Sequence, residues 1–299
     1  MSGLQRIPLT RGYLLDCYRI ERVISSGGFS LIYLASDINT QDKVVLKEYY
    51  PDKITQRVPG GRLQAVSEQT KPTYILGLQQ FLAEAAALAG IKHPNIVNVF
   101  NFFRCNSSAY LAMEHVEGRN LRWLVKQHHG RIPQPALVKV VPAVLSGLRA
   151  LHGSRFLHLD IKPANILLRS SGPPLLVDFG AVQYYEPGKH FAGIQTITSG
   201  YSAPEQYQQG EMGPWTDLYA IGATLYACIT GEAPPDARQR LQKDTLPMIQ
   251  GRLSRQYSPH LLSGIYQSLL LDCHSRPATV DAFMRTTFRD FLPGLMDEE

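Results

Sequence analysis

The sequence predicts an α+β chain in two lobes, a smaller lobe rich in strands and a larger lobe that is mainly helical. Short runs of β-branched and aromatic residues fill the part from about Tyr18 to Val116, as expected of strands. Beyond Val116 the longest apolar segments have helical periodicity. The chain has 299 residues, enough to build a core in each lobe. A strand-rich part followed by a helix-rich part indicates an α+β architecture.

The individual elements follow from the same patterns. One helix interrupts the strands at residues 78–90, with Phe81, Ala85 and Leu88 on its apolar face and Gly90 at its end. We expect five strands in the first lobe, at 18–24, 31–37, 43–50, 95–103 and 109–116. The strongest helical segments of the second lobe lie at 135–153, 216–231 and 259–273.

Charge, cysteine content and hydropathy exclude several classes of protein. The formal net charge is +5, but the basic residues are scattered, which argues against a nucleic-acid surface. The first ten residues lack the apolar core of a signal peptide, and the longest apolar run, Tyr219–Ile229, is too short to cross a bilayer. Without any CxxC pair, reduced thiols are favoured over disulfides or zinc at Cys17, Cys105, Cys228 and Cys273. We therefore expect a cytoplasmic protein with no membrane segment and no nucleic-acid partner.

The run "ISSGGFSLIY", Ile24–Tyr33, joins two predicted strands through a pair of glycines. Gly27 and Gly28 allow a tight turn and let a ligand approach the backbone closely. Backbone N–H groups in such a turn can bind phosphate oxygens. Taken alone, the run fits a plain hairpin turn better, and the strand that follows it excludes a Rossmann fingerprint.

Lys47 lies inside the apolar run "VVLKEYY", where a lysine usually extends its ammonium group to water. Glu84 lies on the apolar face of the helix at 78–90, together with Phe81 and Leu88. A buried carboxylate needs a partner, and pairing with Lys47 would offset the cost of its burial. We therefore predict a Lys47–Glu84 ion pair that holds the lysine for contact with a phosphate.

Two further segments, "HLDIKPANILL" from His158 and "LLVDFG" from Leu175, read as short strands joined by a Gly-Pro turn. This hairpin brings Asp178 back beside Asn165 and Asp160. Asn165 and Asp178 supply the hard oxygen donors that Mg²⁺ prefers. Asp160 is then left to accept a proton, and Lys162 to neutralise a transferring phosphate. A polar hairpin would explain each residue singly, but not why all four converge.

In this order, "SSGGFSLIY", Lys47, Glu84, "HLDIKPAN", "DFG" and "APE" resemble the motifs of a eukaryotic-type (Hanks-type) protein kinase. The stretches "KEYYP", "GPWTDLYAIGATLY" and "TGEAPPDA" are similar to those of bacterial serine/threonine kinases. The resemblance runs from Tyr18 to about Phe291 and implies a bilobal fold with ATP in the cleft. It divides the chain into a leader at 1–17, a kinase domain at 18–292 and a tail at 293–299. Within the kinase domain the N-lobe covers 18–116 and the C-lobe covers 117–292.

The resemblance implies catalytic roles in the second lobe. Asp160 would accept the proton of a serine or threonine hydroxyl on a protein substrate, with Lys162 beside the γ-phosphate of ATP. Thr198 would brace both side chains. A lysine at Lys162 and a threonine at Thr198 are typical of serine/threonine enzymes rather than tyrosine enzymes. Autophosphorylation is expected in the activation segment, which offers Thr196, Thr198 and Ser199.

The resemblance also implies a nucleotide and metal site. Lys47, paired with Glu84, would contact the α- and β-phosphates, while Asn165 and Asp178 would hold Mg²⁺, or Mn²⁺ in its place. The implied nucleotide-binding residues are Ile24, Ser25, Ser26, Gly27, Gly28, Phe29, Ser30, Ile32, Val45 and Lys47, with Met113 as the gatekeeper and Glu114 and Val116 at the hinge.

Several supporting contacts follow from the same resemblance. Glu205 and Arg276 would form a buried ion pair, and Asp217 would tie the catalytic loop to the start of a helix. The residues that match the hydrophobic spine of the family are Leu88, Val99, His158 and Phe179.

The chain departs from the family pattern at four positions. Ser25 and Ser30 replace the first and third glycines of the loop, which restricts its backbone. Val45 stands where a small alanine is usual, which narrows the adenine pocket. Leu159 replaces the arginine that normally pairs with a phosphorylated activation loop. We therefore hypothesise that activity does not depend on that switch.

The connection between Lys47 and Glu84 is longer than usual and covers residues 50–79. Its stretch "RVPGGRLQAV" predicts a small hairpin around Pro-Gly-Gly. Because long insertions are tolerated at the surface, we interpret this segment as a surface excursion rather than a regulatory or docking element.

Two other classes of protein fit part of the pattern. Small-molecule phosphotransferases of the choline or aminoglycoside kinase type share the His-x-Asp-x4-Asn spacing, but usually lack a lysine at Lys162, the DFG glycine and the APE segment. Pseudokinases typically lose the counterpart of Lys47, Asp160 or Asp178, and all three remain here. The serines of the glycine loop leave the second alternative open.

Overall fold

The computed structural model describes residues 6–190 and 196–291, and its chain divides into two units. The units are formed by Met1–Lys92 with Val97–Val116 and by His93–Ile96 with Glu117–Glu299. Residues 1–5 of the predicted leader, and the whole predicted tail 293–299, lie outside the described residues.

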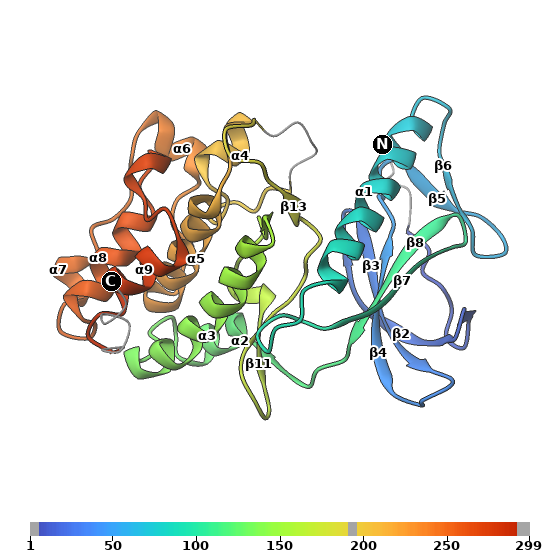
Figure 1. Ribbon diagram of the computed structural model, residues 1–299, viewed down its shortest axis with the longest axis horizontal. Helices are drawn as coiled ribbons and strands as arrows, with labels where there is room; N and C mark the ends of the chain where they lie inside the picture. Colours follow the sequence, from blue (N-terminus) through green and yellow to red (C-terminus); the bar gives the residue numbers. More distant parts are fainter. Residues whose placement is uncertain (1–5, 191–195, 292–299) are drawn as a thin grey trace. The chain divides into compact units, whose positions relative to one another are not determined.

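An antiparallel sheet forms most of the first unit (Figure 1). Its edge strand Val99–Cys105 alternates between buried and less buried side chains, whereas the inner strands Lys43–Tyr49 and Ser108–Glu114 are buried at most positions. The strand order is β1-β2-β3-β4-β8-β7. The bounds are β1 Leu14–Leu15, β2 Tyr18–Gly27, β3 Ser30–Asp37, β4 Lys43–Tyr49, β7 Val99–Cys105 and β8 Ser108–Glu114. The five predicted strands are present, but the two-residue β1 makes the sheet six-stranded. The strand predicted at 95–103 starts only at Val99, because Ile96 belongs to the second unit and bridges Leu176 there.

Helix α1, Lys71–Ala89, packs on this sheet against β7 and β8. Tyr49 at the end of β4 contacts two rings of the helix, with centroid distances of 5.8 Å to Tyr74 and 5.7 Å to Phe81. The helix starts seven residues before the predicted residue 78, because its first turns expose Ile75 and Leu76 and therefore lack a clear apolar stripe.

The two faces of the sheet have different coverings. Successive side chains of a strand point to opposite faces, so Lys47 lies on the face of Tyr49 and α1, and Glu48 lies on the other. On that other face the hydroxyl groups of Tyr33 and Tyr110 donate hydrogen bonds to Glu48. The fully buried Glu48 carboxylate therefore belongs to the interior, although it follows Lys47 directly.

The segment between β4 and α1 folds into the hairpin β5–β6, Thr55–Arg57 and Leu63–Ala65, as its Pro-Gly-Gly pattern predicts. Most residues of this segment are exposed or half-buried, as expected of a surface excursion, but one side chain reaches the interior. The Arg57 side chain is only 4% exposed and forms an ion pair with Glu48 at 2.5 Å. Because a buried carboxylate is costly without a cation, the hairpin supplies an arginine to the core of the unit.

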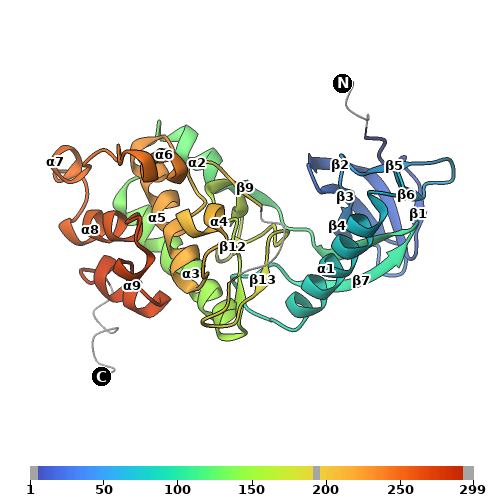
Figure 2. The same ribbon diagram turned by 90° about the horizontal axis from the view of Figure 1, so that it is seen from above.

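The second unit is built around two long helices, α3 (Gln134–Gly153) and α5 (Pro214–Thr230) (Figure 2). Helix α5 is apolar on all sides and buried over most of its length, as expected of a helix inside a core. Helices α8 (Pro259–Ser268) and α9 (Val280–Thr287) pack against it. The remaining helices are α2 Leu121–Gln127, η1 Pro163–Asn165, α4 Pro204–Gln208, α6 Ala237–Gln242, α7 Gln250–Leu253 and η2 Cys273–Ser275.

In the described part of the chain, α3 alone is long and apolar enough to cross a membrane by length and composition. Its apolar side is nevertheless part of the core of the second unit, where Leu137, Val141, Leu145 and Leu148 are buried. This burial is typical of a core helix.

Two small sheets position the polar loops of the second unit. Their strand orders are β12-β11-β9 and β10-β13. The bounds are β9 Gly118–Asn120, β10 Phe156–Leu157, β11 Ile166–Arg169, β12 Leu175–Leu176 and β13 Gln183–Tyr184. Ile166 pairs with Leu176, so the segments before β11 and after β12 lie at the same end of this hairpin.

Candidate active site

The polar residues that follow β10 converge on the carboxylate of Asp160, which is 9% exposed. It accepts hydrogen bonds from Lys162 Nζ at 2.7 and 2.8 Å, from Thr198 Oγ1 at 2.7 Å and from Asn165 Nδ2 at 3.0 Å. Lys162 Nζ also donates to Thr198 Oγ1 at 3.2 Å. Each carboxylate oxygen of Asp160 thus has two donors, and four of the predicted site residues form one hydrogen-bonded cluster.

The backbone of this loop is held by Asp217 in the first turn of α5. Asp217 is fully buried and accepts the backbone N–H groups of His158 and Leu159, both at 2.8 Å. Leu159 has a φ of +61°, a left-handed conformation that is uncommon for leucine. Such strain persists where the surrounding structure over-determines it, and the two hydrogen bonds to Asp217 do so here. Helix α5 therefore sets the direction of the Asp160 side chain, as the family resemblance implied for Asp217.

The β11–β12 hairpin brings the segment of Asp178 to Asn165. The backbone N–H of Val177 donates to the Asn165 carbonyl at 2.9 Å, and Asp178 follows in a left-handed conformation with a φ of +63°. The side-chain nitrogen of Asn165 donates to both the backbone carbonyl of Asp160, at 2.8 Å, and its carboxylate. With the amide N–H groups used in this way, the amide oxygen of Asn165 is left as an acceptor.

His158 and Phe179 pack their rings together, with centroids 4.9 Å apart. Burial lowers the pKa of the His158 imidazole, although the carboxylates of Asp217 and Asp160 act to raise it. The imidazole is therefore neutral near pH 7 and packs as part of the core. The other two predicted spine residues, Leu88 and Val99, are buried in the first unit.

The segment after Thr198 is anchored by a buried ion pair. Arg276 donates to both carboxylate oxygens of Glu205, at 2.8 and 3.0 Å, which confirms the pair that the resemblance implied. Thr216 of α5 donates to the same carboxylate at 2.8 Å. Gln206 donates to the backbone carbonyl of Leu159 at 3.1 Å. The activation segment and the catalytic loop are thus joined directly.

Leu159 itself lies in a small apolar cluster, where the family usually has an arginine. The cluster consists of Leu157, Leu159, Ala181 and Met212, with Tyr185 packed against it. An arginine at this position would place its charged group next to apolar neighbours. The cluster agrees with the hypothesis that activity does not depend on the switch in which this arginine pairs with a phosphorylated activation loop.

In the first unit, the glycine-rich run forms the turn between β2 and β3. Gly27 pairs with Ser30, so Gly28 and Phe29 are the two residues of the turn. Neither Gly27 nor Gly28 has a left-handed φ, and a Cβ added at either would meet nothing within 4 Å. The turn itself therefore does not require glycine. The open space beside it agrees with the close approach of a ligand to the backbone.

Lys47 and Glu84 are near each other without forming the predicted ion pair. Lys47 is 5% exposed in β4. Burial raises the pKa of the Glu84 carboxyl to about 8, and the charge of Lys47 offsets only part of this effect. Within residues 6–190 and 196–291, no ion pair joins the Glu84 carboxylate to a cationic group. The prediction of a Lys47–Glu84 ion pair is therefore wrong for this conformation, because helical periodicity gives the face of a residue but not its distance from a strand.

The remaining predicted nucleotide residues divide by exposure. Val45 lies opposite Met113 in the register of β4 and β8, so the valine and the gatekeeper position share one face of the sheet. Met113 is buried, and Ile32, Val45, Glu114 and Val116 are half-buried. The exposed members are Ile24, Ser25, Ser26, Gly27, Gly28 and Phe29.

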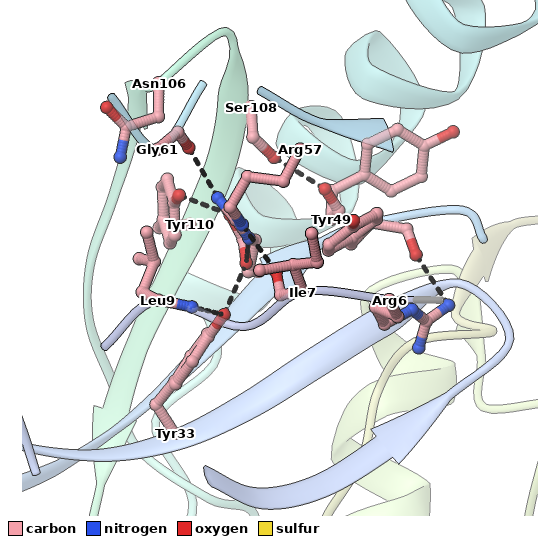
Figure 3. Close-up of polar contacts among 12 residues, drawn as sticks. Arg6, Ile7, Leu9, Tyr33, Tyr49, Arg57, Gly61, Asn106, Ser108 and Tyr110 are labelled. Atoms are coloured by element: carbon pink, nitrogen blue, oxygen red, sulfur yellow. Dashed lines mark hydrogen bonds and ion pairs between the residues drawn. The ribbon is translucent and has the colours of Figure 1, made fainter. Parts of the chain in front are cut away.

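The polar groups on the opposite face of the sheet were not evident from the sequence pattern. Figure 3 shows Arg57 beside Tyr33 and Tyr110, where it also donates to the carbonyls of Gly61 at 2.5 Å and Ile7 at 2.7 Å. The only signal in the sequence was Glu48, a carboxylate within an apolar strand. Its partner lies nine residues away in a hairpin that carries no motif.

Comparison with known proteins agrees with this geometry. The family model described as the protein kinase domain matches residues 18–289 of this chain. The chain is 32% identical over 230 residues to the serine/threonine-protein kinase PknL of Mycobacterium tuberculosis, covering 77% of this chain and 53% of PknL. It is 28% identical to the serine/threonine-protein kinase pkn3 of Myxococcus xanthus, covering 89% of this chain and 48% of pkn3. The chain thus spans about half the length of these relatives.

A solved structure of PpkA-294 in its apo form has a TM-score of 0.81 and 29% identity, over 94% of this chain and 99% of the other. A solved structure of a mutant of the Mycobacterium tuberculosis PknI kinase domain has a TM-score of 0.70 and 20% identity, and the match covers 95% of this chain and 99% of the other. At this identity the likeness supports the fold alone. With a family model that covers most of its length, this chain belongs to the protein kinase domain family. The predicted bilobal kinase fold is confirmed.

Proposed function

We propose that this chain is a serine/threonine protein kinase that transfers the γ-phosphate of ATP to hydroxyl groups of protein substrates. The observation that carries the proposal is the cluster in which Lys162 and Thr198 both bind the Asp160 carboxylate. Small-molecule phosphotransferases usually lack this lysine, and pseudokinases usually lose the aspartate. The names of the relatives point the same way.

Asp160 is the proposed catalytic base. Its carboxylate has a fixed direction, because its backbone is held through Asp217 and its oxygens by neighbouring donors. A serine or threonine hydroxyl placed against it can lose its proton to the carboxylate as the new P–O bond forms. The Lys162 ammonium group, which binds the same carboxylate, would neutralise charge on the transferring phosphoryl group. Catalysis of this kind depends on positioning and charge stabilisation.

Asn165 and Asp178 are the proposed ligands of Mg²⁺, or of Mn²⁺ in its place. Their chemistry fits, because the Asn165 amide spends its N–H groups on Asp160 and leaves its oxygen as an acceptor, and Asp178 adds a carboxylate. When bound, the ion would neutralise phosphate charge and orient the phosphate chain. Asn165 then has two roles, since the same amide that binds the ion also restrains Asp160.

The first unit supplies the proposed nucleotide-binding groups. Lys47 would contact the α- and β-phosphates, and Glu84 would approach it in the active conformation. The backbone of the glycine-rich turn would bind phosphate oxygens. The full proposed set is Ile24, Ser25, Ser26, Gly27, Gly28, Phe29, Ser30, Ile32, Val45, Lys47, Met113, Glu114 and Val116.

Three finer features belong to the proposal. The kinase domain spans residues 18–292, with lobes at 18–116 and 117–292. Autophosphorylation falls on the activation segment, at Thr196, Thr198 or Ser199. The chain acts in the cytoplasm, a reducing compartment that agrees with the free thiols of its four cysteines.

The test is phosphate incorporation into protein from Mg-ATP, compared between the wild type, Asp160→Ala and the surface control Glu232→Ala. We expect phosphoserine or phosphothreonine by mass spectrometry with the wild type and the control, and none with Asp160→Ala. Equal incorporation by Asp160→Ala would reject Asp160 as the base. Incorporation into small molecules alone, or phosphotyrosine alone, would reject the protein serine/threonine assignment.

A further inference from the structure

Arg6, in the segment before β1, lies against the glycine-rich turn. Its guanidinium donates to four backbone carbonyls: those of Gly28 at 2.9 Å, Ser30 at 3.1 Å, Tyr50 at 2.8 Å, and Gly27. The same group donates to the Ser26 hydroxyl at 3.0 Å and lies 3.5 Å from the Asp52 carboxylate. With its side chain only 10% exposed, Arg6 is an internal part of the unit rather than a surface charge.

The position of Arg6 is fixed by neighbours outside the turn. Its guanidinium lies over the Tyr50 ring, 5.1 Å from the centroid, and the guanidinium of Arg57 lies 5.0 Å from the same ring. Arg57 is in turn held by Glu48 and donates to the backbone carbonyl of Ile7, the residue after Arg6 (Figure 3). The backbone N–H of Leu9 donates to the Tyr33 hydroxyl at 3.2 Å. The hairpin at β5–β6, through Arg57, and strand β3, through Tyr33, therefore hold the segment that carries Arg6.

The arrangement fixes the peptide planes of the turn. The carbonyls of Gly28 and Phe29 also accept backbone N–H groups from Asp52, at 3.0 Å, and Tyr50, at 2.8 Å. In a planar trans peptide the N–H points opposite to the C=O. Because Arg6 draws the carbonyls of Gly27 and Gly28 to itself, the N–H groups of Gly28 and Phe29 point away from Arg6. Successive N–H groups on one side of a turn can bind an anion.

We propose that Arg6 is a positioning residue for the nucleotide, acting through the glycine-rich turn: it presets the turn so that the N–H groups of Gly28 and Phe29 are directed to the phosphates. This inference rests on the proposed function, because it takes the turn as the phosphate-binding element. In this chain Ser25 and Ser30 replace two of the flexible glycines, and an arginine from outside the motif holds the turn in place. Preorganisation of this kind lowers the cost of ordering the turn when the nucleotide binds.

The experiment compares Arg6→Ala, Arg6→Lys and the matched control Arg11→Ala, which removes an exposed arginine from the same segment. Hydrogen exchange of the turn is measured without nucleotide, and KM for ATP and kcat are measured with a protein substrate. For Arg6→Ala we expect faster exchange of the turn and a KM for ATP raised about tenfold, with kcat within about twofold of the wild type, since tenfold corresponds to about 1.4 kcal/mol. The KM for the protein substrate stays unchanged. For Arg6→Lys we expect an exchange rate and a KM for ATP between those of the wild type and Arg6→Ala, because one ammonium group cannot reach all four carbonyls.

The outcomes separate this proposal from the proposed function. Faster exchange with an unchanged KM for ATP would mean that Arg6 is merely structural, and unchanged exchange would mean that it does not restrain the turn; either result overturns the proposal. A fall in kcat alone also overturns it. If Arg6→Ala does not fold, Arg6→Lys is judged by the same two readouts. If the wild type neither binds ATP nor transfers phosphate, the proposed function fails, whereas the exchange measurement still decides whether Arg6 holds the turn.

Discussion

Two carboxylates, the buried Asp160 in the second unit and the half-buried Glu84 in the first, have opposite surroundings. Asp160 receives two donors on each oxygen, from residues that the local chain and α5 hold in place. Glu84 lies on α1, where burial raises its pKa to about 8 and Lys47 offsets only part of the effect. Glu48, which lies on the face of β4 opposite to Lys47, resembles Asp160, since Arg57, Tyr33 and Tyr110 all donate to it.

The difference separates two kinds of polar group. A built-in group has its partners in place in the folded unit, whereas a conditional group gains its partner only after a change of conformation. A carboxylate whose donors come from its own loop or from a fixed hairpin is complete as soon as the unit folds. Glu84 can form an ion pair with Lys47 only if α1 and strand β4 come closer together. We infer that the catalytic loop is preassembled, whereas the Lys47–Glu84 pair is a conformational variable of the first unit.

The largest expected effect is on stability, at the completed carboxylate of the first unit. Arg57→Met leaves Glu48 buried without its cation, so we expect a loss of about 3–5 kcal/mol in the free energy of unfolding. The measurement is urea denaturation at pH 7, with the exposed Arg62→Met as control. Adding Glu48→Gln to Arg57→Met should recover much of the loss, because the uncompensated charge is gone. A loss below about 1 kcal/mol, within the range of a surface ion pair, would contradict the view that Glu48 is built in.

The next effect is on catalysis, at the completed carboxylate of the second unit. Thr198→Val removes the hydroxyl that donates to Asp160 and accepts from Lys162. We expect kcat to fall about 100-fold, equivalent to about 2.7 kcal/mol, with little change in KM for ATP. Steady-state kinetics with a protein substrate measures both constants. Thr198→Ser keeps the hydroxyl and should retain most activity; if it is as impaired as Thr198→Val, the hydroxyl is not what positions Asp160.

The conditional carboxylate gives a pH-dependent prediction. Because the pKa of Glu84 is about 8 in the folded chain, against an ordinary 4.5, the folded protein keeps a proton between these pH values that the unfolded chain has lost. Stability therefore falls as pH rises through this window. Glu84→Gln removes the ionisation. The free energy of unfolding of the variant, relative to that of the wild type, should therefore rise by about 1–3 kcal/mol between pH 5 and pH 8.5.

Denaturation of both proteins at a series of pH values measures this gain, with the exposed Glu68→Gln as control. A difference that does not change with pH would show that the Glu84 carboxyl is not strained by burial. The same variant should lose phosphotransfer, because a neutral amide cannot complete an ion pair with Lys47. A more stable but less active protein is the result expected of a functional residue that is costly to the fold.

The sequence was most informative where the chemistry is local. Asp160, Lys162 and Asn165 lie within six consecutive residues, and one hairpin returns the chain to Asp178, so their spacing predicted that these segments meet. Thr198, the fourth member of the observed cluster, was expected only from the family resemblance. The strands and the core helices were predicted for the same reason, since periodicity marks the buried face. Periodicity could not predict the start of α1, because its first turns expose Ile75 and Leu76.

Long-range polar partners were beyond the reach of the pattern. A charged residue in an apolar strand signals that a partner exists, but the choice of partner depends on the folded path of the chain. Lys47 and Glu84 were paired because each is a charged residue in a predicted apolar strand or helix. Arg57 and Arg6, by contrast, reach β4 and the glycine-rich turn from segments without a motif. The same limit explains the incorrect ion pair and the missed one.

The smallest effect is expected at Thr196 in the activation segment. In a kinase that is switched by phosphorylation, an arginine before the catalytic aspartate binds the phosphate; here Leu159 fills that position and packs among Leu157, Ala181 and Met212. Since the catalytic loop is already completed by Asp217 and Thr198, a phosphate has no comparable group to order. Thr196→Ala should therefore change kcat/KM by less than about twofold, and phosphatase treatment of the wild type should do the same. A tenfold loss in either measurement, restored when the protein is phosphorylated again, would show that the loop of the second unit is as conditional as the ion pair of the first.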